Sequence, residues 1–115
     1  MAHLSDLERL RDGWDGPGSK AIPTQVFANY ATLVAAFDSR IPSDLEPTAR
    51  GNGAIVLEWE RGRLSFTAEL EPDGGMWLCR LNLRFVADDE DHQFSAFDAA
   101  VVKQFYDTGH IPQRD

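Results

Sequence analysis

The strongest constraint on the fold of this chain is the alternation of apolar and polar side chains between residues 54 and 85. Side chains on a β-strand point to opposite faces in turn, so this two-residue period predicts strands with one apolar face. The turn-forming sequences Arg61–Gly62 and PDGG, residues 72–75, divide the stretch into segments. We therefore expect an antiparallel three-stranded meander formed by residues 54–60, 63–70 and 76–85.

Matching the apolar faces predicts a register for both hairpins. Pairing Glu60 with Arg63, and Glu71 with Met76, keeps apolar residues opposite one another throughout. The face expected to be buried then consists of Ile55, Leu57, Trp59, Leu64, Phe66, Ala68, Leu70, Trp77, Cys79, Leu81, Leu83 and Phe85. The opposite, solvated face is expected to carry Glu58, Ser65, Thr67, Glu69, Arg80, Asn82 and Arg84.

Segments on both sides of the strands repeat apolar residues at steps of three and four, which is typical of amphipathic helices. We expect a short helix over Asp6–Asp12, a longer one from Pro23 to Phe37, and a last one between Ser95 and Gly109. Capping boxes at residues 5–8 and 95–98, a first-turn proline and terminal glycines support these limits. The pattern predicts a single α+β domain over residues 1–115: two N-terminal helices, the meander, and a C-terminal helix packed on one face of the sheet.

Glycine is concentrated in the link between the first two helices, DGWDGPGSKA, residues 12–21. We interpret this link as a structural corner formed by Gly13, Trp14, Asp15, Gly16 and Gly18. In this interpretation the glycines turn the chain, Asp15 accepts backbone N–H groups of its own loop, and Trp14 plugs the gap between helices and sheet. A phosphate-binding loop is disfavoured because such loops follow a strand and usually end in Lys-Ser/Thr, whereas here alanine follows the lysine.

The stretches GWDGPGSKA and GAIVLEWE also carry a resemblance. A W-D-G-x-G sequence between an N-terminal helical segment and a longer amphipathic helix is similar to a group of small, poorly characterised bacterial proteins. These proteins tend to be found in phage-derived or mobile gene neighbourhoods. The resemblance covers about residues 1–60. It implies the helical layout and a mobile-element setting, and it assigns no catalytic residue.

The charge balance limits the kinds of partner that the chain suits. Eleven Lys and Arg against nineteen Asp and Glu give a formal net charge of −8. Binding to nucleic acid usually needs a basic stripe, and none is evident, so direct nucleic-acid binding is not expected. An acidic excess suits either solubility alone or docking on a basic partner. The expected partner-binding residues are the consecutive acids Asp88, Asp89, Glu90 and Asp91, together with Asp73 and Glu71.

No residue pattern indicates catalysis, a cofactor or a metal site. The single Cys79 excludes an internal disulfide and is expected to be a small buried hydrophobe. The sequence DDEDH, residues 88–92, lacks the spacing and central glycine of an EF-hand, so a solvated acidic loop is expected there. Acid–base chemistry needs a buried carboxylate, and Glu58 and Glu69 are expected on the wet face. Because no long apolar run and no signal-peptide pattern is present, we expect no membrane association and a cytoplasmic location.

These observations predict a non-enzymatic acidic binding protein that inhibits or neutralises a basic protein or a nucleic-acid-binding complex. Anti-restriction, anti-CRISPR, antitoxin and immunity proteins share this profile, and the phage-related resemblance agrees with it. One alternative is a ligand-binding or enzymatic domain with a pocket at the Trp14 corner. Another is a structural adaptor that homodimerises through a sheet edge or through Met76 and Leu78, so both a monomer and a homodimer stay open.

Overall fold

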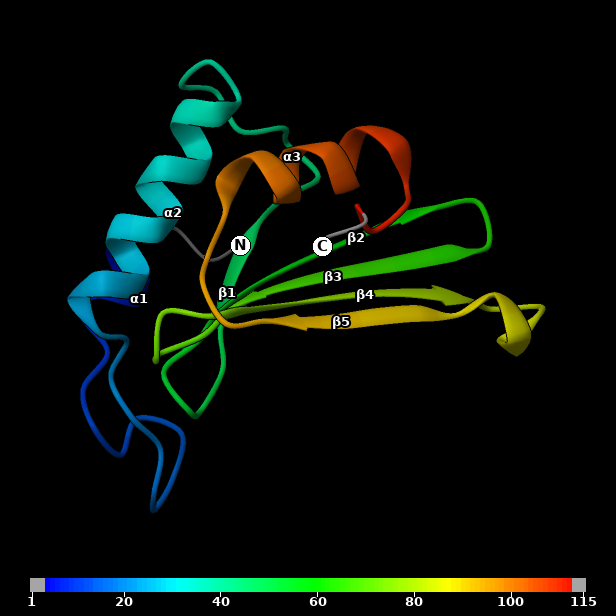
Figure 1. The fold of residues 1–115 in the computed structure, drawn as a ribbon. Coiled ribbons are helices and arrows are strands. Elements are labelled where there is room, and N and C mark those ends of the chain that lie inside the picture. Colours follow the sequence, from blue (N-terminus) through cyan, green and yellow to red (C-terminus); the bar gives the residue numbers. More distant parts are fainter. Residues whose placement is uncertain (1–3, 113–115) are drawn as a thin grey trace.

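The computed structural model describes residues 4–112 and contains a five-stranded antiparallel sheet in the order β1-β2-β3-β4-β5 (Figure 1). The strands are β1 (Pro47–Ala49), β2 (Ile55–Arg61), β3 (Leu64–Leu70), β4 (Met76–Asn82) and β5 (Glu90–Phe94). The helices are α1 (Leu4–Glu8), α2 (Thr24–Ala36), α3 (Ala99–Thr108) and the short 3-10 helix η1 (Val86–Asp88). The predicted α+β class is confirmed, and the sheet has a strand on either side of the predicted meander.

The two additional strands lie at the edges of the sheet and lack the apolar alternation of the central strands. Strand β1 has three residues and begins with Pro47, which suits an edge because proline cannot donate to a ladder. Strand β5 has the sequence EDHQF, and Arg80 pairs with Glu90 across β4 and β5. The prediction of a solvated acidic loop over residues 88–92 is therefore wrong from Glu90 onward.

The first predicted hairpin keeps its faces but is shifted by two residues. Arg61 pairs with Leu64 and Trp59 with Phe66, so Gly62 and Arg63 form the turn. Gly62 has a φ of 61°, as the first position of a two-residue hairpin turn favours. Because side chains alternate with a period of two, a shift of two residues leaves the same residues on the apolar face.

The second predicted hairpin is wrong by one residue, which turns β4 over. Leu70 pairs with Met76 rather than with Trp77. The loop is shorter than expected because Gly75 already bonds to Glu71, and Gly74 has a φ of 93°, the left-handed residue that ends a three-residue hairpin loop. As a result Met76 and Leu78 face the core, and the residues expected there, Trp77, Cys79 and Leu81, lie on the other face.

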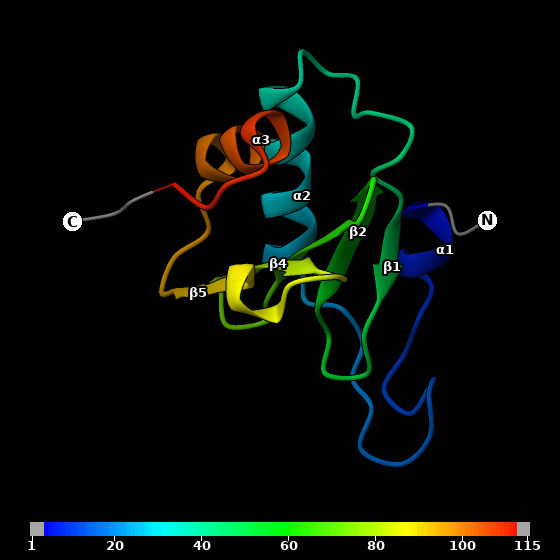
Figure 2. The same ribbon diagram turned by 90° about the vertical axis from the view of Figure 1, so that its right-hand side faces the viewer.

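The core lies between the sheet and the helices α2 and α3, which cover the same face (Figures 1 and 2). Helix α2 buries Val26, Tyr30 and Leu33, and α3 buries Val101, Val102 and Phe105. An aromatic cluster joins the layers. Trp59 of β2 stacks on Phe66 of β3 with ring centroids 5.4 Å apart, and Phe105 of α3 lies edge-on to both rings, at 5.5 and 5.6 Å. This cluster fixes α3 on the sheet.

The limits of all three helices differ from the predicted ones. Helix α1 spans Leu4–Glu8 rather than Asp6–Asp12, so Ser5 of the predicted capping box lies inside it. Helix α2 spans Thr24–Ala36, with Pro23 as its N-cap residue rather than its first residue. Asp98 caps α3, since its carboxylate accepts the N–H groups of Ala100 and Val101, and Gly109 ends α3 with a φ of 76° as expected. Among residues 4–112, no helix is long and apolar enough to cross a membrane.

Candidate functional site

The predicted corner, residues 12–21, is a self-contained loop held by its own hydrogen bonds. The amide of Gly13 donates to the carbonyl of Ser19 over 2.9 Å. The Ser19 hydroxyl accepts from the amide of Asp15 over 2.9 Å and donates to the carbonyl of Gly16 over 2.7 Å. The left-handed φ angles belong to Gly13, Gly16 and Gly18, at 89°, 97° and 86°. The glycines therefore serve the backbone conformation of the loop, as expected.

The structure corrects the roles predicted for Trp14 and Asp15. Trp14 is only half-buried and lies outside the hydrophobic core, because the loop projects away from the sheet (Figure 1). Its indole N–H donates to the carbonyl of Lys20 over 2.8 Å and thus closes the loop itself. The acceptor role expected of Asp15 falls to Asp12, whose carboxylate accepts from the amide of Ala21 over 2.9 Å. The corner is a structural element that docks on the turn before β2 through the amide of Lys20.

We expect Gly16→Ala to lower the free energy of unfolding by about 1–2 kcal/mol, because a Cβ disfavours the left-handed backbone. The space around Gly16 is open, so the effect is conformational and not a clash. Gly51→Ala is the matched control, since Gly51 has no left-handed φ and its Cβ would make ordinary contacts at 3.6 and 3.8 Å. Urea unfolding of both variants measures the difference, and equal stabilities would contradict this account of the corner.

The acidic residues predicted to bind a partner are partly engaged within the chain. Asp88 accepts from the Asn82 amide group over 3.3 Å, and Asp89 accepts from the backbone N–H of Asn82 over 2.7 Å. Glu90 is 3.1 Å from Arg80 Nη1, and Asp91 accepts from the indole N–H of Trp77 over 3.2 Å. These bonds hold the hairpin between β4 and β5 together. The four acids therefore stabilise this hairpin and do not form one free exposed cluster.

The structure places Glu71 and Asp73 away from the start of this acidic run. Asp73 accepts from the amide of Gly75 in the turn between β3 and β4, and Glu71 accepts from the side-chain amide of Gln93. Gln93, which binds Glu71, comes four residues after Asp89, so the two positions are about 13 Å apart along an extended strand. Burial raises the pKa of the Glu71 carboxyl above its ordinary value, and its charged neighbours Asp73 and Glu69 add to this. The six predicted residues therefore form two groups. Asp88 to Asp91 lie at the start of β5, and Glu71 and Asp73 lie near its end, beside Gln93.

The face of the sheet that α2 and α3 leave uncovered, here called the open face, carries a stripe of apolar residues. Strand pairing places Trp77, Cys79 and Leu81 of β4 on this face. Asp91 of the neighbouring strand β5 pairs with Cys79 on one side of the stripe. On the other side Glu58 and Glu60 of β2 lie two strands away, beyond the hydroxyl residues of β3. Strand β4 is thus apolar on both faces, since Met76 and Leu78 lie in the core.

An ion pair and a thiol with a raised pKa define the chemistry of the open face. Arg50 forms an ion pair with Glu69 over 3.0 Å, and the Glu69 side chain is largely buried in it. Burial raises the pKa of the Cys79 thiol, and the nearby carboxylates of Asp91 and Asp89 raise it further. A raised pKa keeps the sulfur protonated and unreactive near neutral pH, so Cys79 is a packing residue, as the sequence predicts.

Sequence reasoning missed Trp77 and Leu81 as surface residues, although a signal was present. Residues 76–79, MWLC, are apolar without a break, so their pattern fits burial of either face equally well. The length of the loop before β4 decides which face is buried. The homodimer interface proposed through Met76 and Leu78 is wrong, because both side chains are fully buried in the core.

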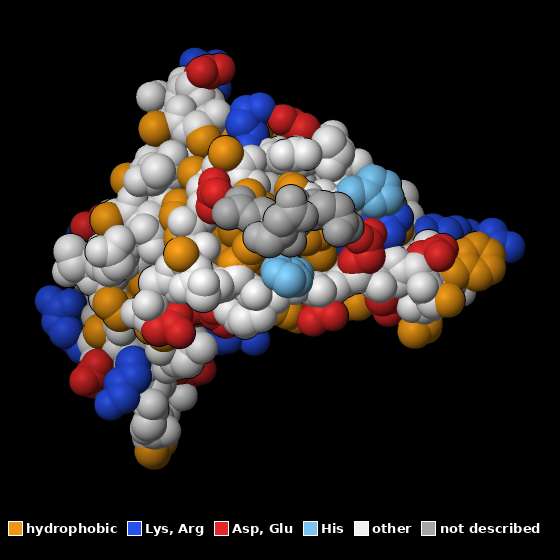
Figure 3. Space-filling view, viewed as in Figure 1, with side chains coloured by type: hydrophobic (Ala, Val, Ile, Leu, Met, Phe, Trp, Pro, Cys, Tyr) orange, Lys and Arg blue, Asp and Glu red, His pale blue; other side chains and the backbone are white. Residues whose placement is uncertain are grey.

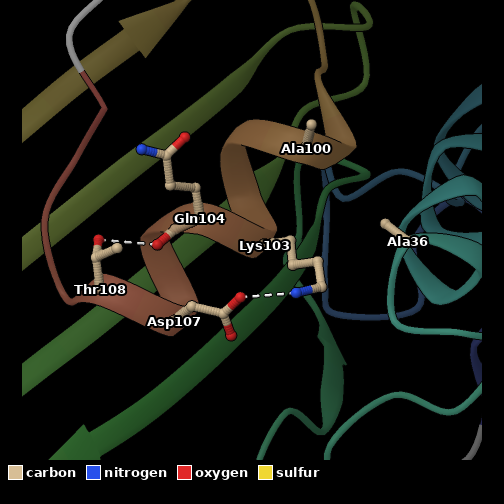
Figure 4. Close-up of a pocket in the computed structure, with 6 residues that line it drawn as sticks. All are labelled: Ala36, Ala100, Lys103, Gln104, Asp107 and Thr108. Carbon is tan, nitrogen blue, oxygen red and sulfur yellow. Dashed lines mark hydrogen bonds and ion pairs between the residues drawn. The ribbon is translucent and has the colours of Figure 1, made fainter.

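A hollow of about 420 Å³ lies between α2 and α3 (Figure 4). It is lined by Ala36, Ala100, Lys103, Gln104, Asp107 and Thr108. Lys103 and Asp107 form an ion pair of 2.7 Å, and the Thr108 hydroxyl donates to the carbonyl of Gln104. These polar groups satisfy one another, and the hollow lies away from the corner at which a pocket was expected. Within residues 4–112 no group of three or more His, Cys, Asp or Glu is placed to hold a metal ion.

Comparison of the chain with known protein families, characterised proteins and solved structures finds no match. The resemblance based on the W-D-G-x-G corner therefore stays a prediction. The candidate site rests on geometry alone, and the open face is the surface on which apolar and acidic side chains are brought together.

Proposed function

We propose that this protein binds a basic partner protein through the open face of its sheet and acts as an inhibitor or neutraliser of that partner. The observation that carries the proposal is the apolar stripe of β4 on a face that also carries Glu58 and Glu60 of β2 and Asp91 of β5. The partner classes expected from the sequence are nucleases, toxins and nucleic-acid-binding defence complexes. Such proteins share a basic site that an acidic protein can occupy.

The arrangement of the open face resembles the general anatomy of a protein interface. An apolar centre supplies the free energy of burial, while a charged rim selects the partner and speeds association by electrostatic steering. Trp77 is the largest side chain of the apolar stripe, and its indole N–H donates a hydrogen bond to Asp91 that orients the ring before binding. A held aromatic side chain loses little conformational entropy on docking and is a common centre of binding energy.

The charges on the open face favour a basic partner over a neutral or acidic one. Glu58 and Glu60 are exposed and lie two residues apart on β2, on the same side as Asp91. Arg50, a cation on this side, is bound to Glu69 and does not neutralise the other acids. A basic surface would relieve the mutual repulsion of these carboxylates when it docks.

The test compares two variants that remove the same number of negative charges. One is Glu58→Gln/Glu60→Gln/Asp91→Asn on the open face, and the control is Glu8→Gln/Asp15→Asn/Asp38→Asn outside the sheet. Asn suits Asp38 because this residue has a φ of 56°. Each immobilised protein is exposed to lysate of the host cell at low and at high salt, and retained proteins are identified by mass spectrometry.

We expect the wild type and the control to retain one and the same basic protein at low salt and to release it at high salt. The open-face variant should lose this protein, because steering and rim contacts depend on the removed charges. Retention by the open-face variant equal to that of the wild type would contradict the proposal. Thermal unfolding of all three proteins checks that the substitutions leave the fold intact.

A further inference from the structure

The hairpin between β4 and β5 ends in a tip, residues 83–86, whose apolar side chains are directed into solvent. Leu83, Phe85 and Val86 have exposed fractions of 64%, 55% and 79%. The tip projects beyond the body of the protein, and hydrophobic side chains gather at its end (Figures 1 and 3). Soluble proteins rarely expose several large apolar side chains side by side, and such a patch indicates an interaction site.

The backbone of the tip is held in place by side chains at its base. The side-chain oxygen Oδ1 of Asn82 accepts the backbone N–H groups of Arg84 and Phe85 over 2.9 and 3.0 Å. The backbone N–H of Asn82 is itself bound by Asp89, and Arg80 donates to the carbonyl of Asp88 over 2.9 Å. The amide of Leu83 donates to the carbonyl of Arg63 in the neighbouring turn. These bonds hold the backbone at the base of the tip, from which the apolar side chains extend into solvent.

We propose that this tip is an anchor that enters an apolar pocket on the basic protein bound by the open face. The inference rests on the proposed function and deepens it by naming what the partner must offer. The tip follows the stripe of the open face directly, since Leu83 comes one residue after the end of β4 and two residues after Leu81. A pre-organised apolar anchor binds well because its side chains and backbone are already ordered in the folded protein, so little conformational entropy is lost on binding.

The net charge of the chain favours this occupant over an anionic lipid bilayer or a second copy of the chain. Asp88 and Asp89 lie at the base of the tip, and the whole chain has a net charge of −8. This charge opposes approach to an anionic membrane and to another copy with the same charge. The cations at the tip are Arg63 and Arg84, and the Arg84 guanidinium lies 5.2 Å from the centroid of the Phe85 ring. We therefore expect the partner's pocket to accept the exposed Phe85 ring and to offer a hydrogen-bond acceptor near Arg84.

The first experiment incorporates the photo-crosslinker p-benzoylphenylalanine in place of Phe85 in the full chain, inside host cells. The matched control carries it in place of Gln104, an exposed residue of α3 in the helical layer. After irradiation, position 85 should cross-link to the same basic protein that the open face retains, and position 104 should not. A cross-link from position 85 to phospholipid or to a second copy of the chain, or none at all, overturns the proposal.

The second experiment measures binding of that purified partner to the Phe85→Ala/Val86→Ala variant. Because both side chains are exposed, thermal stability should stay that of the wild type. The dissociation constant should rise about 30-fold or more, through faster dissociation, as expected for loss of a central anchor. Wild-type affinity in the tip variant, together with loss of the partner in the open-face variant, overturns the anchor and leaves the proposed function standing. Unchanged retention by the open-face variant overturns the proposed function itself.

Discussion

Leu78→Ala is expected to lower the free energy of unfolding by about 2–5 kcal/mol, whereas Leu81→Ala in the same strand should change it by less than about 1 kcal/mol. Both substitutions remove the same atoms from β4, so the difference reports only which face each residue occupies. Leu78 is 0% exposed and lies in the core, while Leu81 is 43% exposed on the open face. Deleting a fully buried side chain costs its whole transfer free energy and leaves a cavity, whereas deleting a half-exposed one costs only part of the transfer free energy and leaves no enclosed cavity.

Urea unfolding of the two variants, followed by far-ultraviolet circular dichroism, measures this difference. The dependence of the free energy on urea should stay that of the wild type, which checks that the unfolding reaction is unchanged. A larger loss for Leu81→Ala than for Leu78→Ala would mean that β4 is paired one residue away, in the register that apolar alternation alone predicts.

The faces of β2 and β3 could be predicted from sequence. In each strand only one of the two alternating sets of side chains is mostly large and apolar, so only that set suits the core. In β2 the outward positions include Glu58 and Glu60, and in β3 they include Ser65 and Thr67. Apart from Val56, each outward residue of these two strands is charged or hydroxylated, so burial of that face is disfavoured. The shift of two residues at Gly62 is invisible to such a pattern, because it preserves the parity of every side chain.

The face of β4 could not be predicted because its first residues are apolar at both parities. The choice is made by the loop before it, where Gly74 takes a left-handed φ and Gly75 already belongs to the ladder. The sequence PDGG favours a turn but allows loops of three or four residues. The register that is wrong by one residue predicts Leu83 and Phe85 on the buried face, whereas both side chains are exposed at the tip of the hairpin.

The edge strands had no apolar pattern from which they could be predicted. Strand β5 is held by pairing to β4 and by contacts such as the ion pair of Arg80 with Glu90. These contacts depend on where β4 lies, and the sequence of residues 90–94, EDHQF, has a single apolar residue, Phe94, and no alternation. The sign of the charge on the candidate site was therefore predictable, while the division of the acids between hairpin contacts and open face was not.

For the corner at residues 12–21, the backbone conformation could be predicted from the local sequence, but the position of the loop in the fold could not. Its left-handed glycines follow from local chemistry, since few other residues adopt that backbone. Its place in the fold depends on the bond between the amide of Lys20 and the carbonyl of Gly51, 2.7 Å long, which joins segments that are distant in sequence. No local pattern indicates that bond, and the predicted burial of Trp14 between helices and sheet was wrong for this reason.

Trp59→Ala is expected to lower the free energy of unfolding by about 3–5 kcal/mol, a large part of the stability of a domain of this size. The indole is 4% exposed and contacts the rings of Phe66, Phe105 and Tyr106, so it joins β2 and β3 to α3. Its removal leaves a cavity at the point where α3 rests on the sheet. Within residues 4–112 its N–H has no hydrogen-bond partner, so the loss is one of packing rather than of a polar contact.

Trp14→Ala is the matched control, since it makes the same substitution in the half-buried residue of the corner. It removes the hydrogen bond to the carbonyl of Lys20 and part of the loop packing, for an expected cost of about 1–2 kcal/mol. Thermal and urea unfolding of both variants measure the difference, and near-ultraviolet circular dichroism reports whether the aromatic cluster survives. If Trp14→Ala lowers the free energy of unfolding as much as Trp59→Ala does, then Trp14 is a core residue, in contradiction to its place in the corner. The smaller loss expected here follows because an indole that bonds within its own loop stabilises that loop, whereas Trp59 holds two layers of the fold together.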